Sequence, residues 1–287
     1  MTRRQRAEAW ALRAGFGLFG ILPLDAASAF GGWLARMVGP RLRAHRIARR
    51  NLTRALPGLT PAQVDAALRG MWDNLGRVAA EYPHLPALRL GFGHTELVGR
   101  EHVEAALAAG RPVIFFSAHF GNWEILGPVA AQVGLPTVQV YRAANNPGAE
   151  AVIEAMRGDL GGRRVPKGAK AARSILAALK QGESLAMLVD QKMNDGIAVP
   201  FFGRPAMTAP ALAELALRHG LAVIPAHVER LAGTRFRVIA EAPLVFDDTG
   251  DRPADVAAAM GRVNRILEGW IAARPDLWFW VHRRWPD

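Results

Sequence analysis

The 287-residue sequence contains no cysteine. Disulfide bonds, thiolate metal sites and cysteine nucleophiles are therefore excluded. It also lacks the Gly-x-Ser-x-Gly elbow of serine hydrolases and the GxxxxGK(S/T) phosphate-binding loop, which argues against nucleotide chemistry. Its eight histidines are scattered, and none forms a His-x2–4-His or His-Glu-x-x-His pair that would predict a metal site. We therefore expect neither a cofactor nor a metal.

Positive charge is distributed very unevenly along the chain, whose net charge is +11. Residues 1–54 contain eleven arginines and no lysine, against only Glu8 and Asp25, so this segment carries +9 and the rest of the chain +2. A basic terminus of this kind favours an anionic membrane surface, nucleic acid or an acidic protein as a partner. A plain solvated basic arm is the simpler alternative.

The segment at 14–35 is nearly uncharged and lies inside this basic region. It has the length of a membrane span and Asp25 as its sole charge, but Pro23 interrupts it. No small-residue cleavage site follows, so we do not expect a secretory signal. Three structures stay open: a single span with the following domain held in the cytoplasm, a helix lying in the membrane interface, and a buried helical hairpin.

Strand-like and helix-like segments alternate over most of the chain. This alternation predicts an α/β fold with a largely parallel central sheet and helices on both faces. Hydrophobic residues make up 51% of the chain, enough for a sizeable core. We expect a basic, apolar, membrane-associating helical arm over 1–56 and an α/β domain over 57–287. The predicted strands are one ending near 117, then 136–141, 183–190, 221–229 and 235–241; the predicted helices are one starting at 61, then 101–109, 148–159, 168–181, 208–219 and 254–273.

Residues 111–127 hold the strongest candidate for chemistry. An apolar run of strand length ends at His119, and the chain then turns through Gly121 into a predicted helix that carries Glu124. On one continuous helix the five-residue offset would place His119 and Glu124 on different faces. A strand end, a glycine turn and a first helical turn can instead bring them together as a general base and its orienting carboxylate. The helix N-terminus near Asn122 could stabilise an oxyanion.

Two further residues belong to the same edge of the predicted sheet. Asp190 ends a second strand, and ligands of open parallel sheets bind beyond the carboxyl ends of the strands. Ser117 lies two residues before His119 and would point to the same side, so a serine nucleophile stays open despite the missing elbow. A histidine with a purely structural role is the alternative for His119.

Two clusters outside this edge also combine charge with aromatic or helical character. A basic group over 163–173 fits a phosphate, a sugar acid or an acidic partner, or simply a solvated helix face. The C-terminal PDLWFWVHRRWPD sets three tryptophans beside arginines, which suits a membrane interface or a terminal strand packed on the core. The basic group consists of Arg163, Arg164, Lys167, Lys170 and Arg173.

Blocks of sequence along nearly the whole chain resemble one enzyme family. HFGNWE at 119–124 has a His-x4-Asp/Glu pattern, and five further blocks occur in the family's order. Together they resemble the lipid A biosynthesis lauroyl/myristoyl acyltransferases, the late acyltransferases of lipopolysaccharide assembly. The five blocks are RRNLTRALP (49–57), NLGRVAAE (74–81), VYRAANNP (140–147), LVDQKMNDGIAVPFFG (188–203) and WFWVHRRW (278–285).

This resemblance implies a glycerolipid-acyltransferase-like fold and a definite reaction. A fatty acyl chain, lauroyl-like, would pass from acyl carrier protein directly to a hydroxyl of a Kdo-bearing lipid A precursor. The reaction would occur at the cytoplasmic face of the bacterial inner membrane, without a metal or an acyl-enzyme. The resemblance implies His119 as general base and Glu124 as its partner. It marks as substrate-binding or site-supporting Asn122, Arg142, Asp190, Gln191 and Arg283.

Several alternatives stay open at this point. The acceptor could be another membrane lipid, such as a lysophospholipid, an amino-acid lipid or a mannosylated phosphoinositide. A non-catalytic binder of anionic membranes or nucleic acid would use the basic arm, although the arm lacks the aromatic interleaving of a nucleic-acid module. We therefore expect no nucleic-acid partner. A serine esterase using Ser117 is the third reading.

Overall fold

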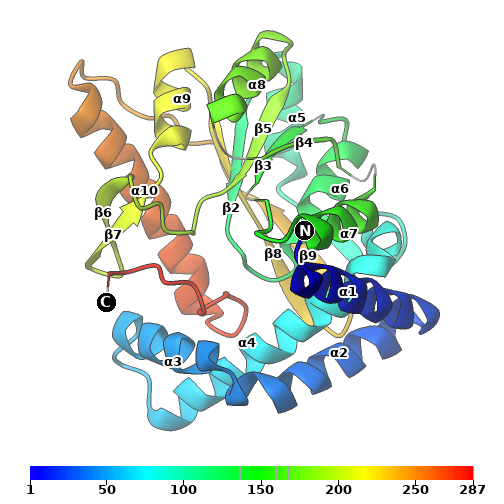
Figure 1. Cartoon of the computed structure of the whole chain (residues 1–287). Helices are drawn as coiled ribbons and strands as arrows, with labels where there is room; N and C mark the ends of the chain where they lie inside the picture. Colours follow the sequence, from blue (N-terminus) through cyan, green and yellow to red (C-terminus); the bar gives the residue numbers. More distant parts are fainter. Residues whose placement is uncertain (136, 142, 159–160, 167–168, 287) are drawn as a thin grey trace.

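The computed structural model describes the chain except residues 136, 142, 159–160, 167–168 and 287 and the side chains of 169–171. Its centre is a seven-stranded sheet in the order β1-β9-β8-β2-β5-β3-β4 (Figure 1). Neighbouring strands are parallel except β8 and β9, so the predicted fold class is confirmed. The strands are β1 (Thr95–Val98), β2 (Ile114–Ser117), β3 (Thr137–Tyr141), β4 (Arg163–Pro166), β5 (Ser184–Leu188), β8 (Val223–Ala232) and β9 (Arg235–Ala240).

Helices cover both faces of the sheet because successive side chains of a strand point to opposite sides. In β2, Phe116 stacks on Trp270 of α10 with 5.9 Å between ring centroids. Phe115 packs on the opposite side, near Val103 of α5. Figure 1 accordingly shows α9 and α10 on one side of the sheet and α5, α6 and α7 on the other. These helices are α5 (Arg100–Ala108), α6 (Leu126–Gln132), α7 (Pro147–Arg157), α8 (Ala169–Lys180), α9 (Ala211–His219) and α10 (Arg252–Ala273).

Nearly the first third of the chain is helical and packs on the sheet domain. Thr60 begins α4 with a capping box, in which its hydroxyl accepts from the backbone N–H of Gln63 and the Gln63 side chain accepts from the N–H of Thr60. Helix α2 lies along α4, and the backbones meet where Gly31 faces Gly76. The elements are α1 (Arg3–Ile21), α2 (Leu24–Val38), η1 (Gly39–Arg41), α3 (Arg43–Ala55), α4 (Pro61–Glu81) and η2 (Tyr82–Leu88).

The nearly uncharged segment at 14–35 forms the end of α1 and most of α2. Pro23 separates the two helices because its ring fixes φ and removes a backbone donor. Among the described residues, no helix combines the length and the apolar character that crossing a bilayer requires.

The structure adds elements that the sequence pattern did not predict. Strands β1 and β4 have only four residues each, too few for a clear alternation. Strands β6 (Ile197–Phe201) and β7 (Arg204–Thr208) form an antiparallel hairpin in which Pro200 faces Pro205, and proline weakens a strand prediction. The C-terminal segment is irregular instead of a strand, and its tryptophans belong to the core and not to a membrane interface. Trp278, Trp280 and Trp285 are 0%, 0% and 4% exposed.

Candidate active site

The register of the sheet brings His119 next to Asp190. In the parallel pair β2–β5, Ser117 lies opposite Leu188, and His119 and Asp190 each follow two residues later. The ring Nδ1 of His119 lies 2.8 Å from Oδ1 of Asp190, and the backbone N–H of His119 donates to Oδ2 at 2.9 Å. When Nδ1 carries the proton that bonds the carboxylate, Nε2 is the nitrogen left to accept a proton. The pair therefore has the geometry that a general base and its orienting carboxylate require.

The Asp190 carboxylate is buried and charged. Trp278 Nε1 donates to its Oδ2 at 2.9 Å, and His282 Nε2 lies 3.8 Å from the same oxygen. Burial alone would raise the pKa of Asp190, but the charge and hydrogen bonds of His119 and the charge of His282 outweigh it and hold the pKa well below its usual range. An ionised carboxylate at this position stabilises the imidazolium that forms when His119 takes a proton.

Glu124 occupies a different polar network. Arg157 of α7 donates to both of its oxygens, from Nε at 2.8 Å and from Nη2 at 2.7 Å. Tyr82 Oη at 2.6 Å and Trp123 Nε1 at 3.0 Å donate to its Oε1. Burial would raise the pKa of Glu124, but these donors, above all Arg157, lower it. Glu124 is therefore a fixed anion paired with a fixed cation.

The expected hydrogen bond between His119 and Glu124 is thus replaced by one between His119 and Asp190. As predicted, the chain through 119–124 turns at Gly121 and does not form one continuous helix. Gly121 has a φ of +58°, which favours glycine, and a Cβ at this position would overlap the carbonyl oxygen of Val228. Asn122 then caps the short helix η3 (Trp123–Ile125) by accepting from the N–H of Glu124 at 3.3 Å. After this turn, the Glu124 side chain bonds to Tyr82 of η2 and Arg157 of α7.

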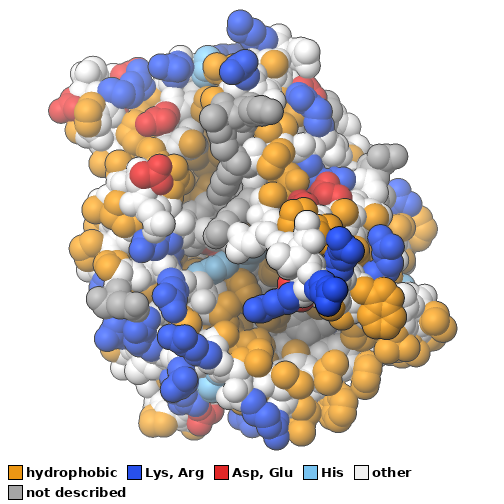
Figure 2. Space-filling view, in the orientation of Figure 1, with side chains coloured by type: hydrophobic (Ala, Val, Ile, Leu, Met, Phe, Trp, Pro, Cys, Tyr) orange, Lys and Arg blue, Asp and Glu red, His pale blue; other side chains and the backbone are white. Residues whose placement is uncertain are grey.

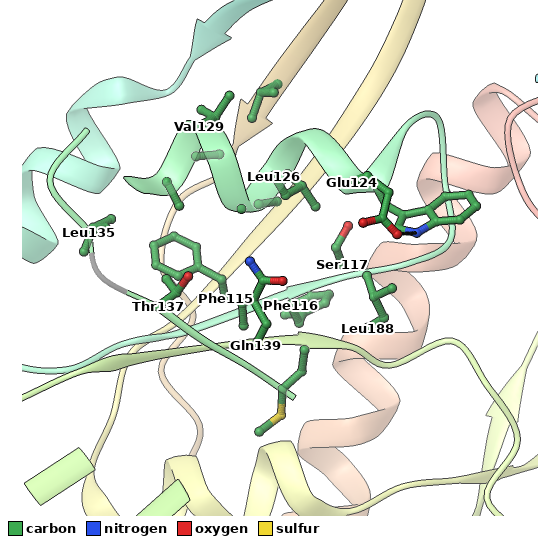
Figure 3. A pocket seen from close by; sticks show the side chains of 18 of the residues that line it. Phe115, Phe116, Ser117, Glu124, Leu126, Val129, Leu135, Thr137, Gln139 and Leu188 are labelled. Carbon is green, nitrogen blue, oxygen red and sulfur yellow. Dashed lines mark hydrogen bonds between the residues drawn. The ribbon is translucent and has the colours of Figure 1, made fainter. Parts of the chain in front are cut away.

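An elongated apolar pocket begins beside these two networks and runs between the sheet and α6. Ser117, Trp123 and Leu188 border it near His119, whose ring centroid lies 5.0 Å from that of Trp123. Figure 3 shows Glu124, Ser117 and Leu188 at one end of the pocket and Val129 and Leu135 toward the other. A lining of this kind suits a hydrocarbon chain whose reactive end stays near His119.

The remaining predicted site residues have varied environments. Gln191 lies beside His119, and the Nε2 atoms of the two side chains are 3.4 Å apart. Asn122 is fully buried and donates to Glu81 at 2.7 Å. Arg283 is exposed, whereas its neighbour Arg284 is buried and donates to Thr208 Oγ1 at 2.8 Å. Arg142 lies outside the described residues.

Sequence reasoning missed three members of the site. Arg157 and Tyr82 hold Glu124, and His282 packs its ring edge-on against His119 at 5.0 Å between centroids. Tyr82 directly follows the 74–81 block, and His282 lies within the 278–285 block. The family resemblance therefore drew attention to both positions but assigned neither of them a function. Arg157 had no signal beyond its place at the end of a predicted helix.

His119, Asp190 and His282 form the group of described residues whose ligand-type atoms come closest to a metal site, all within 4.8 Å of one another. Each oxygen of Asp190 already accepts from a protein donor, and Oδ2 accepts from two. Hydrogen bonds within the protein thus hold the Asp190 carboxylate in its place beside His119.

Of the predicted basic group over 163–173, Arg163 and Arg164 are paired within the protein, whereas Arg173 is exposed. Arg163 bonds to Glu183 at 2.7 Å, and Arg164 bonds to Glu154 at 2.7 Å. The side chains of Lys167 and Lys170 lie outside the described residues.

The arm presents apolar and basic side chains together. Trp10, Ile21 and Trp33 are 73%, 82% and 49% exposed, although large apolar side chains are normally buried. Figure 2 shows hydrophobic side chains gathered over α2 and the later part of α1, and basic side chains over α3 and the start of α1. Further exposed apolar side chains of the arm are Leu18, Phe30, Leu34, Met37, Val38 and Leu42.

Comparisons with known proteins identify the family. The sequence model of the family described as bacterial lipid A biosynthesis acyltransferase matches residues 2–287. The chain is 28% identical over 295 residues to a phosphatidylinositol mannoside acyltransferase of Mycobacterium tuberculosis, covering 96% of this chain and 88% of that protein. It is 26% identical over 276 residues to the lipid A biosynthesis palmitoleoyltransferase of Escherichia coli, covering 92% and 86%.

A third relative is the lipid A biosynthesis lauroyltransferase of Escherichia coli, 28% identical over 198 residues that cover 66% of this chain and 61% of that protein. The three relatives are named for different acyl chains or acceptors, but each is named an acyltransferase. The base at the strand ends and the apolar pocket beside it fit that chemistry. The chain therefore belongs to the bacterial lipid A biosynthesis acyltransferase family, and it is an acyltransferase.

Proposed function

We propose that this enzyme moves a fatty acyl chain from the thioester of acyl carrier protein to a hydroxyl of a Kdo-bearing lipid A precursor. The observation that carries the proposal is the His119–Asp190 pair, which lies two residues beyond Ser117 and Leu188 at one end of the apolar pocket. The pocket would take the acyl chain, and the base would take the proton of the acceptor hydroxyl.

In the proposed reaction, Nε2 of His119 removes the hydroxyl proton as the acceptor oxygen attacks the thioester carbonyl carbon. The resulting tetrahedral intermediate carries its negative charge on the former carbonyl oxygen. Its collapse breaks the carbon–sulfur bond, and the proton held on His119 passes to the leaving sulfur. The products are an ester and a free thiol, and no enzyme group becomes acylated. Asp190 fixes the ring and stabilises its charged form during both proton transfers.

The arm supports a location at the cytoplasmic face of the inner membrane, where both substrates would meet. Exposed tryptophans and aliphatic side chains beside arginines are typical of helices that lie in a membrane interface. The same arginines would attract a phosphorylated lipid acceptor and an acidic carrier protein. We therefore propose that α1 and α2 lie on the bilayer and hold the pocket mouth near it.

A second acceptor class is also supported by a specific observation. The mycobacterial relative covers 96% of this chain and is named for phosphatidylinositol mannoside. A mannosylated phospholipid shares with the lipid A precursor a sugar hydroxyl and an anionic headgroup. The arrangement of base and pocket suits either.

One assay separates these possibilities. The purified protein is given acyl carrier protein donors of graded chain length, with either a Kdo-lipid A precursor or a mannosylated phosphatidylinositol in mixed vesicles. We expect acyl transfer to the lipid A precursor and its loss in His119→Ala, with vesicle binding retained. Transfer to the mannolipid alone would reject the lipid A acceptor, and a wild-type rate in His119→Ala would reject His119 as the base.

A further inference from the structure

The sequence block NLGRVAAE has no role in the reaction described so far, yet it lies against the turn that carries the site. Its first and last residues, Asn74 and Glu81, lie on α4 and are 5% and 0% exposed. Both make hydrogen bonds to the turn at Gly121 and Asn122. That turn sets the directions of His119 on one side and Glu124 on the other.

Asn74 bridges the turn and a buried arginine. Its Nδ2 donates to the carbonyl oxygen of Gly121 at 2.9 Å, and its Oδ1 accepts from Nε of Arg230 at 2.9 Å. Because a guanidinium has only donors, the oxygen of Asn74 must face Arg230, which leaves the amide nitrogen for Gly121. The N–H of Gly121 is held separately by the carbonyl of Leu277 at 3.1 Å. Both backbone groups of Gly121 are thus fixed from outside the turn.

Glu81 is the centre of the cluster. Arg230 binds both of its oxygens, from Nη1 at 2.6 Å and from Nη2 at 2.9 Å. Asn122 Nδ2 donates to its Oε2 at 2.7 Å, while Asn122 Oδ1 caps the turn that carries Glu124. A buried ion pair adds little net stability, but it fixes geometry because removing one partner leaves an uncompensated charge. The turn is thus tied, through Asn122, to an ion pair that is costly to break.

The same carboxylate also connects to the arm. The hydroxyl of Ser28 on α2 donates to Oε1 of Glu81 at 2.7 Å, and Arg77 Nη1 donates to that hydroxyl at 3.2 Å. Farther along α2, Arg36 pairs with Asp73 of α4. Helix α2 carries the exposed Phe30, Trp33, Leu34 and Met37 on its outer side.

We infer that Asn74, Glu81 and Arg230 are positioning residues that form a buried clamp on the catalytic turn, and that Ser28 couples the seating of α2 to this clamp. The clamp acts through Gly121 and Asn122 and touches no substrate. A shift of α2 on the bilayer would reach the turn through one hydrogen bond to Glu81. The inference rests on the proposed function for its kinetic consequences only.

A charge swap gives the sharpest test. Glu81→Gln removes the anion that neutralises Arg230, and Asn122→Asp sets two carboxylates against each other. Each single variant is expected to lower kcat by at least about tenfold, because small displacements of reacting groups carry large kinetic costs. The double variant keeps one amide–carboxylate bond and one negative charge, and it is expected to recover to within about threefold of the wild-type kcat.

Two milder variants test the coupling and carry matched controls. Asn74→Ala is compared with Asn264→Ala, since Asn264 is a buried asparagine that also donates to a backbone carbonyl, that of Pro200 at 2.8 Å. Ser28→Ala is compared with Ser184→Ala, which removes a buried hydroxyl at the opposite end of the strands. We expect kcat to fall by about tenfold or more in Asn74→Ala and by about threefold in Ser28→Ala, with KM unchanged and the controls near wild type.

Amide hydrogen exchange over 119–125 supplies a readout that needs no substrate. The N–H groups of Glu124 and Ile125 are bonded to Asn122 within the turn, and that of Gly121 is bonded to the carbonyl of Leu277. We expect these amides to exchange faster in Asn74→Ala, in Ser28→Ala and in both single swap variants. In the double variant the exchange rates should return to those of the wild type. Binding to phosphatidylglycerol vesicles should be the same in all of them.

The outcomes separate the two proposals. Accelerated exchange in a protein that acylates none of the offered lipids would reject the proposed function and keep the clamp. Unchanged exchange and unchanged kcat in Asn74→Ala and the swap variants would overturn the clamp. Losses that track the melting temperature equally in Asn264→Ala and Asn74→Ala would also overturn it.

Discussion

The carboxylates of Asp190 and Glu124 lie near the same end of the apolar pocket, and their partners differ in kind. Asp190 is fully buried and bonds to His119, whose side chain is 16% exposed. Glu124 is bound through both oxygens by Arg157. In both carboxylates the cost of burial is outweighed by the partner, so the pKa of each lies below its ordinary value.

The difference lies in what the partner can do. An imidazole gains and loses a proton near neutral pH, whereas a guanidinium keeps its charge. Burial would lower the pKa of Arg157, but its bonds to Glu124 raise it further above the usual arginine range. The Asp190–His119 pair can therefore transfer a proton, and the Glu124–Arg157 pair can only hold charge and shape at the pocket mouth.

Replacing Asp190 tests the first half of this comparison and has the largest expected effect. Asp190→Asn should lower kcat by about 10³-fold or more, because an amide neither fixes the tautomer of His119 nor stabilises its charged form. Steady-state assays with the carrier-protein donor measure it, with vesicle binding as the control for folding. A loss of less than about tenfold would assign the orienting role elsewhere.

Breaking the second pair should cost less. Glu124→Gln and Arg157→Gln should each lower kcat by about 10- to 100-fold, because the pair shapes the mouth without moving a proton. The double variant should be no slower than the slower single variant, since the two side chains act as one unit. Additive losses in this cycle would show that each residue contacts the substrate independently. A loss as deep as that of Asp190→Asn would remove the distinction between the pairs.

Acid unfolding sharpens the comparison thermodynamically. The lowered pKa of Asp190 means that the unfolded chain binds its proton first as the pH falls. Its contribution to stability is therefore complete above the ordinary aspartate pKa of about 4 and is lost at lower pH. Urea titrations between about pH 5 and 3 should show the free energy of unfolding falling less steeply in Asp190→Asn than in the wild type. Equal slopes would contradict the lowered pKa.

Ser117 gives the smallest expected effect. It ends the strand that leads to His119 and lines the pocket with Glu124, and its Oγ has no hydrogen-bond partner among the described residues. If transfer is direct, Ser117→Ala should keep kcat within about threefold of wild type. Two results together would instead indicate an acyl-enzyme mechanism: labelling of the wild type at Ser117 by an active-serine probe, and loss of activity in Ser117→Ala.

The sequence pattern predicted much of this arrangement for identifiable reasons. The start of α4 at residue 61 and both ends of α10 were predicted within two residues, and the strands β5 and β8 within three. The carboxyl-end positions of His119 and Asp190 followed from the predicted parallel sheet. Their direct pairing did not, because it depends on the β2–β5 register, and register is set by packing across the sheet.

The partners of Glu124 were hidden from the sequence for a related reason. A five-residue spacing constrains a pair only when the chain between them has a known conformation. Here Gly121 and the Asn122 cap rotate Glu124 toward Arg157, which is 33 residues away in the chain. No local pattern marks such a partner. The buried network around Glu81 depends on contacts between α2, α4 and β8 and was equally hidden.

The exposed apolar side chains of α2, among them Phe30 and Trp33, have a practical consequence for spectroscopy. Because the chain has no cysteine, a thiol introduced at Trp33 or Phe30 would be the sole attachment point for a spin label. Collision with oxygen and with a water-soluble nickel chelate would then report the immersion depth of each position. A label that follows the helical period along α2 would describe the tilt of the enzyme on the bilayer, residue by residue.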